Sequence, residues 1–303
     1  MHESHFYPMI SILTVWGLII LFILQPGIAH DGAVAGAKLF VHALLPYLLP
    51  YIILTQWLLK MPGNPKETPK WRRYIKAYVL GSFGGFPVGA VTVTEMLKNG
   101  ELTKKQSSFL LAACHAPGPM FIIGFVGTEL LGNVSNGWKL LIAIHIANLL
   151  FFILTILFMA KDNESESVQI RPQKPSSTLP LLDAIKESSS VIILVATTVI
   201  FFSSLGNVLS TVTTSAFTVD MGIAKTFALA LFEMTSGVQS ATEHFYHDAI
   251  FPFLIAAIIS MNGLSIHMQV FVIAKAGNIS MIPYVLGRVW SILFVPIIFY
   301  LAY

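Results

Sequence analysis

The sequence predicts an all-α protein that crosses a membrane several times and is built from two inverted repeats. Hydrophobic residues make up 55% of the 303 residues and charged residues only 11%, which is far too apolar for a soluble domain of this length. Several apolar segments of membrane-spanning length contain glycine and proline, which a plain helix avoids. The same order of segments appears in both halves of the chain. We therefore expect a polytopic protein with about seven transmembrane helices and two re-entrant hairpins, and with broken helices at the membrane midplane.

The amino-terminal region, residues 1–30, is predicted to hold a first transmembrane helix over Met9 to Leu24. Lys and Arg are absent before this helix and no small-x-small cleavage site follows it, so we expect a retained helix rather than a signal peptide. The next residues, Gln25 to Ala37, are polar and rich in glycine, which predicts a turn. A second crossing is expected over Lys38 to Leu59.

The central feature of the first half is an apolar run, Gly81 to Glu95, that glycine and proline interrupt. These residues remove helix propensity and one backbone donor, for which a bilayer offers no replacement. Basic residues flank the run on both sides, so a single crossing would leave one basic cluster outside, against the positive-inside rule. We therefore expect Ala77 to Leu97 to form a re-entrant hairpin; one ordinary kinked helix is the alternative. The flanking basic residues are Lys60, Lys66, Lys70, Arg72, Arg73 and Lys76 on one side and Lys98, Lys104 and Lys105 on the other.

Two more crossings complete the first repeat, residues 31–160. Gln106 to Leu131 is long enough to cross, but His-Ala-Pro-Gly-Pro at 115–119 frees backbone carbonyls and predicts a broken crossing. Trp138 to Ala160 crosses back, and His145 and Asn148 lie on one face of it, where they are placed to join neighbouring helices. Residues 161–187 contain prolines, serines and mixed charge, which predict a cytoplasmic linker.

The second repeat, residues 188–303, is expected to follow the same plan. Ser188 to Ser210 and Ile282 to Ala302 read as crossings, and the latter contains Arg288. Between them lie an apolar run with the sequence Glu-Met-Thr-Ser-Gly at 233–237 and a crossing interrupted by Asn-Gly-Leu-Ser at 262–265. An offset of 148 positions lays Thr94-Glu95 on Thr242-Glu243 and Gly89 on Gly237. The order of elements, more than residue identity, predicts the repeat.

The orientation of the repeats follows from their crossings and charges. Each repeat contains an odd number of crossings, so the second must be inverted relative to the first. With the amino terminus in the cytoplasm, most of the 18 Lys and Arg residues fall at cytoplasmic positions, in agreement with the positive-inside rule. We expect a multi-pass protein of a bacterial cell membrane whose second hairpin enters from outside.

Paired broken elements that meet near the midplane are typical of secondary transporters. The ends of their half-helices direct amide dipoles at a substrate, and freed carbonyls and hydroxyls hold it or a coupling ion. We expect the four interrupted stretches to converge on one site. The substrate-binding residues predicted from them are Gly85, Pro87, Gly89, His115, Gly118, Pro119, Thr235, Ser236, Gly237, Asn262, Gly263, Ser265, His267 and Gln269.

Two charged residues are predicted to act as coupling groups or charge partners. Glu233 lies deep in the second hairpin, where it would carry a proton or bind substrate, or else accept hydrogen bonds from the hairpin amides. Arg288 would bind an anionic group, pair with a carboxylate or extend to an interface. His115 and His267 would bind a polar ligand or serve as structural histidines. The coupling ion, H+ or Na+, and the formation of a homo-oligomer are left open.

Other classes of function are disfavoured. The chain contains no G-x-S-x-G and no H-E-x-x-H, so we expect no enzyme and no cofactor. The group Glu243, His244, His247 and Asp248 lacks a third ligand at a firm spacing, so no metal site is expected. The net charge of +3 sits beside membrane segments and gives no reason to expect nucleic acid.

Three motifs carry a resemblance to a known family. Phe86 to Ala90 reads Phe-Pro-Val-Gly-Ala; Gly118 to Gly127, after Cys114, reads Gly-Pro-Met-Phe-Ile-Ile-Gly-Phe-Val-Gly; and Gly263 to Val270 reads Gly-Leu-Ser-Ile-His-Met-Gln-Val. They resemble the YlbJ/SpoVV sporulation membrane proteins of the nucleoside-recognition (Gate) domain group, which is similar in plan to concentrative nucleoside transporters. The resemblance covers most of the chain from Lys38 onwards. Where the family pattern is like Asn-x-Ser-Gly-Pro, this chain has His-Ala-Pro-Gly-Pro.

The resemblance implies transport of dipicolinate, a small aromatic dicarboxylate, during spore formation. It implies that Pro87 to Gly89, Gly118-Pro119 and Gly263 to Gln269 line the site. An excess of hydrogen-bond donors also favours an anion, whereas a nucleoside would use acceptors and carboxamides. We expect a transporter or facilitator of an aromatic carboxylate, with a nucleoside transporter and a non-transporting scaffold of the sporulation machinery as alternatives. The donors are Thr235, Ser236, Ser265, His267 and Arg288; the groups that suit a nucleoside are Glu233, Asn262 and Gln269.

Overall fold

The computed structural model describes residues 6–61, 69–161, 179–217 and 219–303, and every regular element among them is a helix. Five helical segments are long and apolar enough to cross a membrane. Together with the apolar composition, they indicate a helical membrane protein, as the sequence predicts. The five segments are Pro26–Lys60, Val134–Met159, Pro180–Ala216, Phe251–Lys275 and Ile282–Ala302.

The elements of the two halves follow one another in a similar order. The first half contains α1 (Phe6–Leu24), α2 (Pro26–Leu39), the π-helix η1 (Phe40–Leu44), α3 (Leu45–Lys60), α4 (Lys70–Gly84), α5 (Val88–Lys98), α6 (Lys104–Ala113), the π-helix η2 (Phe121–Leu130) and α7 (Val134–Lys161). The second half contains α8 (Pro180–Phe217), α9 (Met221–Phe232), α10 (Met234–Phe245), α11 (Phe251–Met261), α12 (Gly263–Lys275) and α13 (Ile282–Ala302).

All four predicted interruptions are present as breaks between helices. Residues 85–87 separate α4 from α5, and residues 114–120 separate α6 from η2. Glu233 separates α9 from α10, and Asn262 separates α11 from α12. Local chemistry explains the breaks, because Gly85, Asn262 and Gly263 have positive φ angles and prolines follow Cys114 within the second break.

The helix boundaries repeat along the chain with the predicted offset. A distance of 148 residues separates Gly84, where α4 ends, from Phe232, where α9 ends. The same distance separates the start of α7 at Val134 from the start of α13 at Ile282. The helices thus follow a similar order in the two halves, with these two boundaries at the predicted offset.

One predicted turn is wrong. Gln25 to Ala37 does not form a turn, because α2 begins at Pro26 and continues through η1 into α3 as one helical segment. Pro26 occupies the first helical position, which suits proline. Gly32 and Gly36 allow close packing instead, since a Cβ added to either would lie 2.8 Å from an atom of Ser204 or Ser203 in α8. A pair of small residues four apart is a common device for packing membrane helices.

The predicted linker is also shorter than expected. Helix α8 begins at Pro180, so residues 180–187 are helical, and it continues to Phe217, beyond the predicted end at Ser210. Proline again stands at the first helical position. Residues 162–178 of the predicted linker, with Arg171 and Lys174, lie outside the described residues, as does Lys66.

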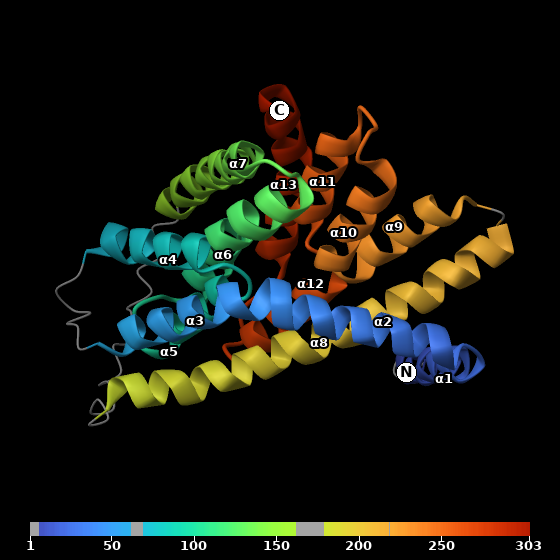
Figure 1. The fold of residues 1–303 in the computed structure, drawn as a ribbon. Coiled ribbons are helices and arrows are strands. Elements are labelled where there is room, and N and C mark those ends of the chain that lie inside the picture. The colour runs from blue at the N-terminus through green and yellow to red at the C-terminus, as the bar shows by residue number, and fades with distance from the viewer. Residues whose placement is uncertain (1–5, 62–68, 162–178, 218) are drawn as a thin grey trace.

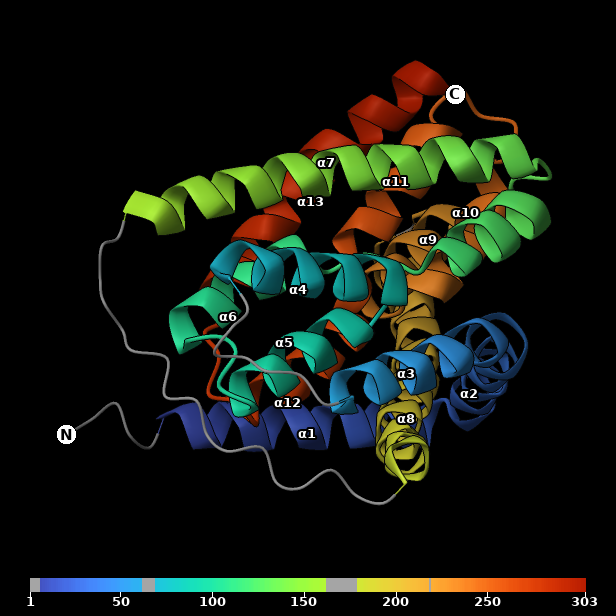
Figure 2. The ribbon, with the colours of Figure 1, turned by 90° about the vertical axis from the view of Figure 1, so that its left-hand side faces the viewer.

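The arrangement of the helices brings the breaks into the interior. Figure 1 shows α8 running alongside α2 and α3, which pack against it. In Figure 2, α8 is seen nearly end-on, and α4 and α5 lie between α7 and α1. Helix α13 packs against α6, α7 and α11, and its side chains Tyr284 and Phe299 are fully buried. The breaks thus lie in the interior, whereas side chains such as Phe83 in α4 and Phe227 in α9 remain exposed.

Candidate functional site

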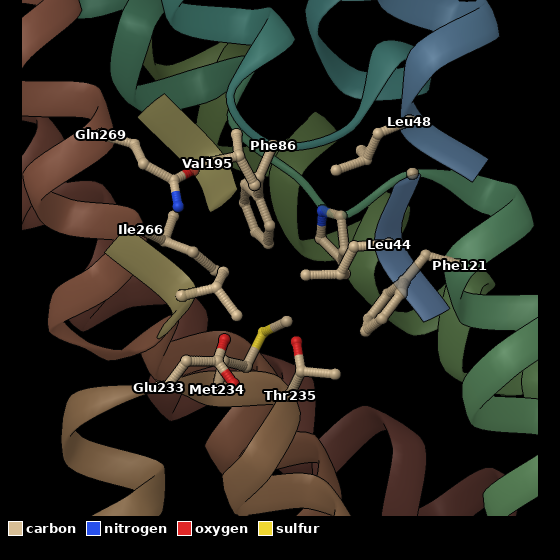
Figure 3. Close-up of a pocket in the computed structure, with 13 residues that line it drawn as sticks. Leu44, Leu48, Phe86, Phe121, Val195, Glu233, Met234, Thr235, Ile266 and Gln269 are labelled. Atoms are coloured by element: carbon tan, nitrogen blue, oxygen red, sulfur yellow. The ribbon is translucent and has the colours of Figure 1, made fainter. Parts of the chain in front are cut away.

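A cavity lies among the helices that flank the four breaks (Figure 3). Its volume is about 30 Å3, which is room for roughly two water molecules. It is lined by Phe86 from the first break, Pro117 and Gly118 from the second, Glu233, Met234 and Thr235 from the third, and Ile266 and Gln269 from the helix after the fourth; Leu44, Leu48, Phe121, Val195 and Val199 complete the wall. Residues from the first three breaks and from the helix after the fourth therefore share one cavity, and the substrate-binding role predicted for them stays a prediction.

In the first half, a close approach of two glycines joins the α4–α5 pair to the α6–η2 break. Gly85 has a φ of +82°, and a Cβ there would lie 2.9 Å from the backbone nitrogen of Gly118. A side chain at Gly85 is therefore excluded both by its backbone conformation and by the neighbouring chain. Gly89 supports the same contact from α5, because its Cβ would lie 2.6 Å from the carbonyl oxygen of Cys114. These glycines hold Phe86 and Gly118 at the cavity.

In the second half, a comparable approach joins the α11–α12 break to the α9–α10 pair. Gly263 has a φ of +68°, and a Cβ there would lie 2.9 Å from the backbone nitrogen of Met234. Gly237 packs against the facing half-helix, since its Cβ would lie 2.4 Å from the Cα of Ala230. The amino-terminal residues of α10 are thereby fixed at the cavity, where Figure 3 shows Glu233, Met234 and Thr235 on the side opposite Phe86.

The polar groups of the cavity are few and buried. Glu233 is 1% exposed and lies just before α10, where its Oε2 accepts a hydrogen bond from the backbone N–H of Ser236 at 2.6 Å. Gln269 is also 1% exposed, and its Nε2 donates to the hydroxyl of Thr198 in α8 at 2.8 Å. Thr235 adds a hydroxyl. A carboxyl group, an amide and a hydroxyl therefore face a wall that is otherwise apolar.

The structure shows the structural role of Glu233 that the sequence offered. As the residue that precedes α10, it caps the helix and satisfies one of its free amides. It also lines the cavity. Its structural role and a role in binding or proton transfer are compatible, because a carboxylate has several acceptor positions.

The remaining predicted residues lie around the cavity rather than in its wall. Ser236 shares a hydrogen bond of 2.9 Å with Ser203 in α8, and His267 Nδ1 lies 2.8 Å from the hydroxyl of Tyr284 in α13. The predicted residues outside the cavity wall are Gly85, Pro87, Gly89, His115, Pro119, Ser236, Gly237, Asn262, Gly263, Ser265, His267 and Arg288.

Sequence reasoning missed most of the apolar wall. Leu44 and Phe121 come from the two π-helices, an uncommon conformation that often marks functional sites. Val195 and Val199 come from α8, where nothing in the sequence distinguishes a valine that faces a cavity from one that faces lipid. The other apolar residues of the wall are next to predicted ones: Phe86, Pro117, Met234 and Ile266. The helix interruptions in the sequence could therefore have identified them as site residues.

Arg288 lies next to both broken crossings. It is buried in α13, and its Nη2 donates to the carbonyl oxygen of Ala112, near the end of α6, at 3.4 Å. With the Asn262 amide oriented to satisfy both of its ends, Arg288 Nη1 donates to its oxygen at 3.2 Å, and its nitrogen donates to the carbonyl of Ile259 at 2.8 Å. Arg288 thus holds the two breaks together.

The comparisons add no relative to this description. No family model, no curated protein and no solved structure matches the chain. Among the residues that the structure describes, no group of three or more His, Cys, Asp or Glu side chains is placed to hold a metal ion.

Proposed function

We propose that the protein is a secondary transporter, or a facilitator, of a small polar organic molecule that binds in the cavity between the four helix breaks. The proposal depends on one cavity that is lined by residues from three of the breaks and from the helix after the fourth. Broken helices are costly in a membrane unless the freed backbone lines a site or is enclosed by protein. Four such breaks around one cavity are the arrangement that alternating access uses.

The chemistry of the cavity bears on the substrate. Most of the hydrogen-bond donors from which an anionic substrate was expected do not line the cavity. These donors are Ser236, Ser265, His267 and Arg288. Glu233 and Gln269 do line the cavity. A dicarboxylate would meet a carboxyl group there and no cation, which is unfavourable in a dry site.

We therefore place an uncharged molecule with hydrogen-bond donors and a flat apolar ring first, and a nucleoside is the representative of this class. Hydroxyl and amino groups of such a molecule would donate to Glu233 and pair with the Gln269 amide. Its ring would contact Phe86, Met234 and Ile266. An aromatic dicarboxylate such as dipicolinate, the substrate implied by the sporulation-protein resemblance, becomes the second candidate.

Binding of either molecule requires the cavity to widen. A cavity of about 30 Å3 is far smaller than the several hundred Å3 typical of small-molecule sites. The two half-helix pairs are the parts that would separate, because each contacts its own broken crossing through glycine, at Gly85 and Gly263. In the proposed mechanism, the inverted repeats open the cavity to one side of a bacterial cell membrane at a time.

The test is uptake by purified protein in liposomes, with labelled uridine and labelled dipicolinate measured in parallel. We expect saturable uptake of uridine that excess unlabelled uridine inhibits. Uptake of dipicolinate alone would show that the protein is a transporter whose substrate is an aromatic dicarboxylate and not a nucleoside. Uptake of neither, by protein shown to be inserted and folded, would favour a non-transporting membrane scaffold.

A further inference from the structure

A second, smaller cavity lies beside the first, and Pro117 belongs to the walls of both. Its volume is about 10 Å3, enough for one particle close to the size of a water molecule. Its lining combines apolar side chains with five polar ones. The polar residues are His115, Asn148, Ser260, Arg288 and Ser291; Ile144, Ile259 and Val295 are apolar neighbours.

Arg288 brings a positive charge to this cavity without a negative one nearby. No carboxylate within the described residues forms an ion pair with it. Its contacts are the carbonyl of Ala112, the amide of Asn262 and the ring of Tyr284, whose centre lies 5.6 Å from the guanidinium carbon. Its Nε has no hydrogen-bond partner. A buried charge that has only neutral partners is unfavourable.

Two more donors in the same wall have no partner. His115 is fully buried, and neither of its ring nitrogens forms a hydrogen bond in the described part of the protein. The side-chain nitrogen of Asn148 is also buried and unpaired. A neutral imidazole has one donor nitrogen, so the wall offers unused donors from Arg288, Asn148 and His115.

The hydroxyl hydrogens of the wall are already used within their helices. Ser260 donates to the carbonyl of Ala256 at 2.7 Å, and Ser291 donates to the carbonyl of Gly287 at 2.9 Å. The acceptors that remain are hydroxyl lone pairs, one imidazole nitrogen and the side-chain oxygen of Asn148. The cavity thus combines three free donors with a net positive charge.

We propose that this cavity binds one small monovalent anion of the size of chloride. Such an anion accepts hydrogen bonds from all three donors and neutralises the charge of Arg288. A water molecule would satisfy the donors but would leave the charge unbalanced. A carboxylate has three heavy atoms, which is too large for a cavity that holds one water-sized particle. The site is distinct from the substrate cavity, and the proposal holds whether or not the protein transports.

The position of the anion gives it a structural effect. Arg288 contacts both broken crossings, at Ala112 and Asn262, so the anion stabilises the charge that holds them together. We therefore expect binding of the anion to raise the free energy of unfolding of the protein.

The test measures thermal unfolding of the purified full-length protein while chloride replaces gluconate at constant ionic strength. We expect the melting temperature to rise with chloride and to saturate. Asn148→Ala keeps the charge and removes one donor, and we expect it to weaken the apparent chloride affinity about ten-fold. Arg288→Met should abolish the chloride dependence, whereas Arg72→Met, on the exposed part of α4, should leave it unchanged.

Bromide soaked into crystals of the parent protein locates the ion without any variant and should give an anomalous peak at Arg288. Equal stability in chloride and gluconate, with no bromide peak, would mean that water alone occupies the cavity and would overturn the proposal. A bromide peak elsewhere, or an undiminished chloride effect in Arg288→Met, would overturn it as well. Stabilisation by dipicolinate but not by chloride would assign the charge of Arg288 to a substrate carboxylate instead.

Discussion

Arg73 Nη1 donates a hydrogen bond to the carbonyl oxygen of Glu101 at 2.7 Å. Arg73 lies near the start of α4, and Glu101 follows the end of α5. The side chain of Glu101 strengthens the contact, since its Oε2 lies 3.0 Å from Lys76 Nζ. The two ends of the α4–α5 pair are therefore joined, as a hairpin requires, although each flank carries positive charge.

This contact predicts that both flanks lie on the cytoplasmic side of the membrane. In a Cys114→Ala background, which removes the single cysteine, we expect Arg72→Cys and Lys104→Cys to react only with a reagent applied from the cytoplasm. Both positions are exposed. Ser135→Cys, in the first turn of α7 and at its end that we expect to lie outside, is the control and should react only from the other side. Reaction of the two flanks from opposite sides would exclude the re-entrant hairpin.

The close contact within the α9–α10 pair predicts a stability effect. We expect Gly237→Ala to destabilise the protein by about 1 to 3 kcal/mol, because the added methyl group would press on the backbone of α9. Gly17→Ala is the matched control, since a Cβ there meets nothing within 4 Å and alanine favours the helix. Thermal unfolding in detergent measures both. Equal melting temperatures for the two variants would show that the half-helices are not packed as described.

The position of the Gln269 amide in the cavity wall leads to a prediction for substrate affinity. Gln269→Leu removes a polar group from the cavity wall, and we expect it to weaken uridine binding about ten-fold. Thr198→Val removes only the partner that orients the amide, because Thr198 does not line the cavity, so its effect should be smaller. Calorimetric titration compares the two. A larger loss in Thr198→Val than in Gln269→Leu would contradict direct contact between Gln269 and substrate.

Glu233 predicts the pH dependence of transport. If its carboxyl group carries a coupling proton, Glu233→Gln should abolish uptake driven by a pH gradient and leave substrate exchange measurable. Glutamine retains a side-chain oxygen, so the hydrogen bond from Ser236 can persist and the fold should survive. Glu243→Gln, at an exposed site on the same helix, should change neither activity. Normal pH-driven uptake in Glu233→Gln would exclude Glu233 as the carrier.

The positions of the breaks were predictable because their causes are local. Gly85 and Gly263 adopt positive φ angles, and the prolines near residue 117 interrupt a helix whatever surrounds them. The repeated order of these signals also predicted their convergence. Local chemistry was therefore sufficient for the breaks, but not for the apolar wall that the π-helices and α8 contribute.

The errors arose where a distant partner decides the outcome. Gly32 and Gly36 look like turn residues, but they pack against Ser203 and Ser204, which lie far along the chain in α8. Arg288 was predicted to be a charge partner, and only the fold shows that it lines a separate cavity with His115 and Asn148. The residues next to a position in the sequence do not indicate which distant residues it contacts in the folded protein.

Helix α8 is 38 residues long, and its length has a mechanical consequence for the surrounding lipid. Residues 188–217 carry no charged side chain, and at about 1.5 Å per residue they extend roughly 45 Å. The hydrocarbon layer is only about 30 Å thick, so α8 would have to tilt to keep this whole segment within it, together with the α2–α3 segment that packs against it. Because the tilt of a helix responds to bilayer thickness, a thicker membrane would reduce the tilt of α8 and of the α2–α3 segment. The acyl-chain length of the host lipid would then adjust the cavity that Val195 and Leu44 help to enclose.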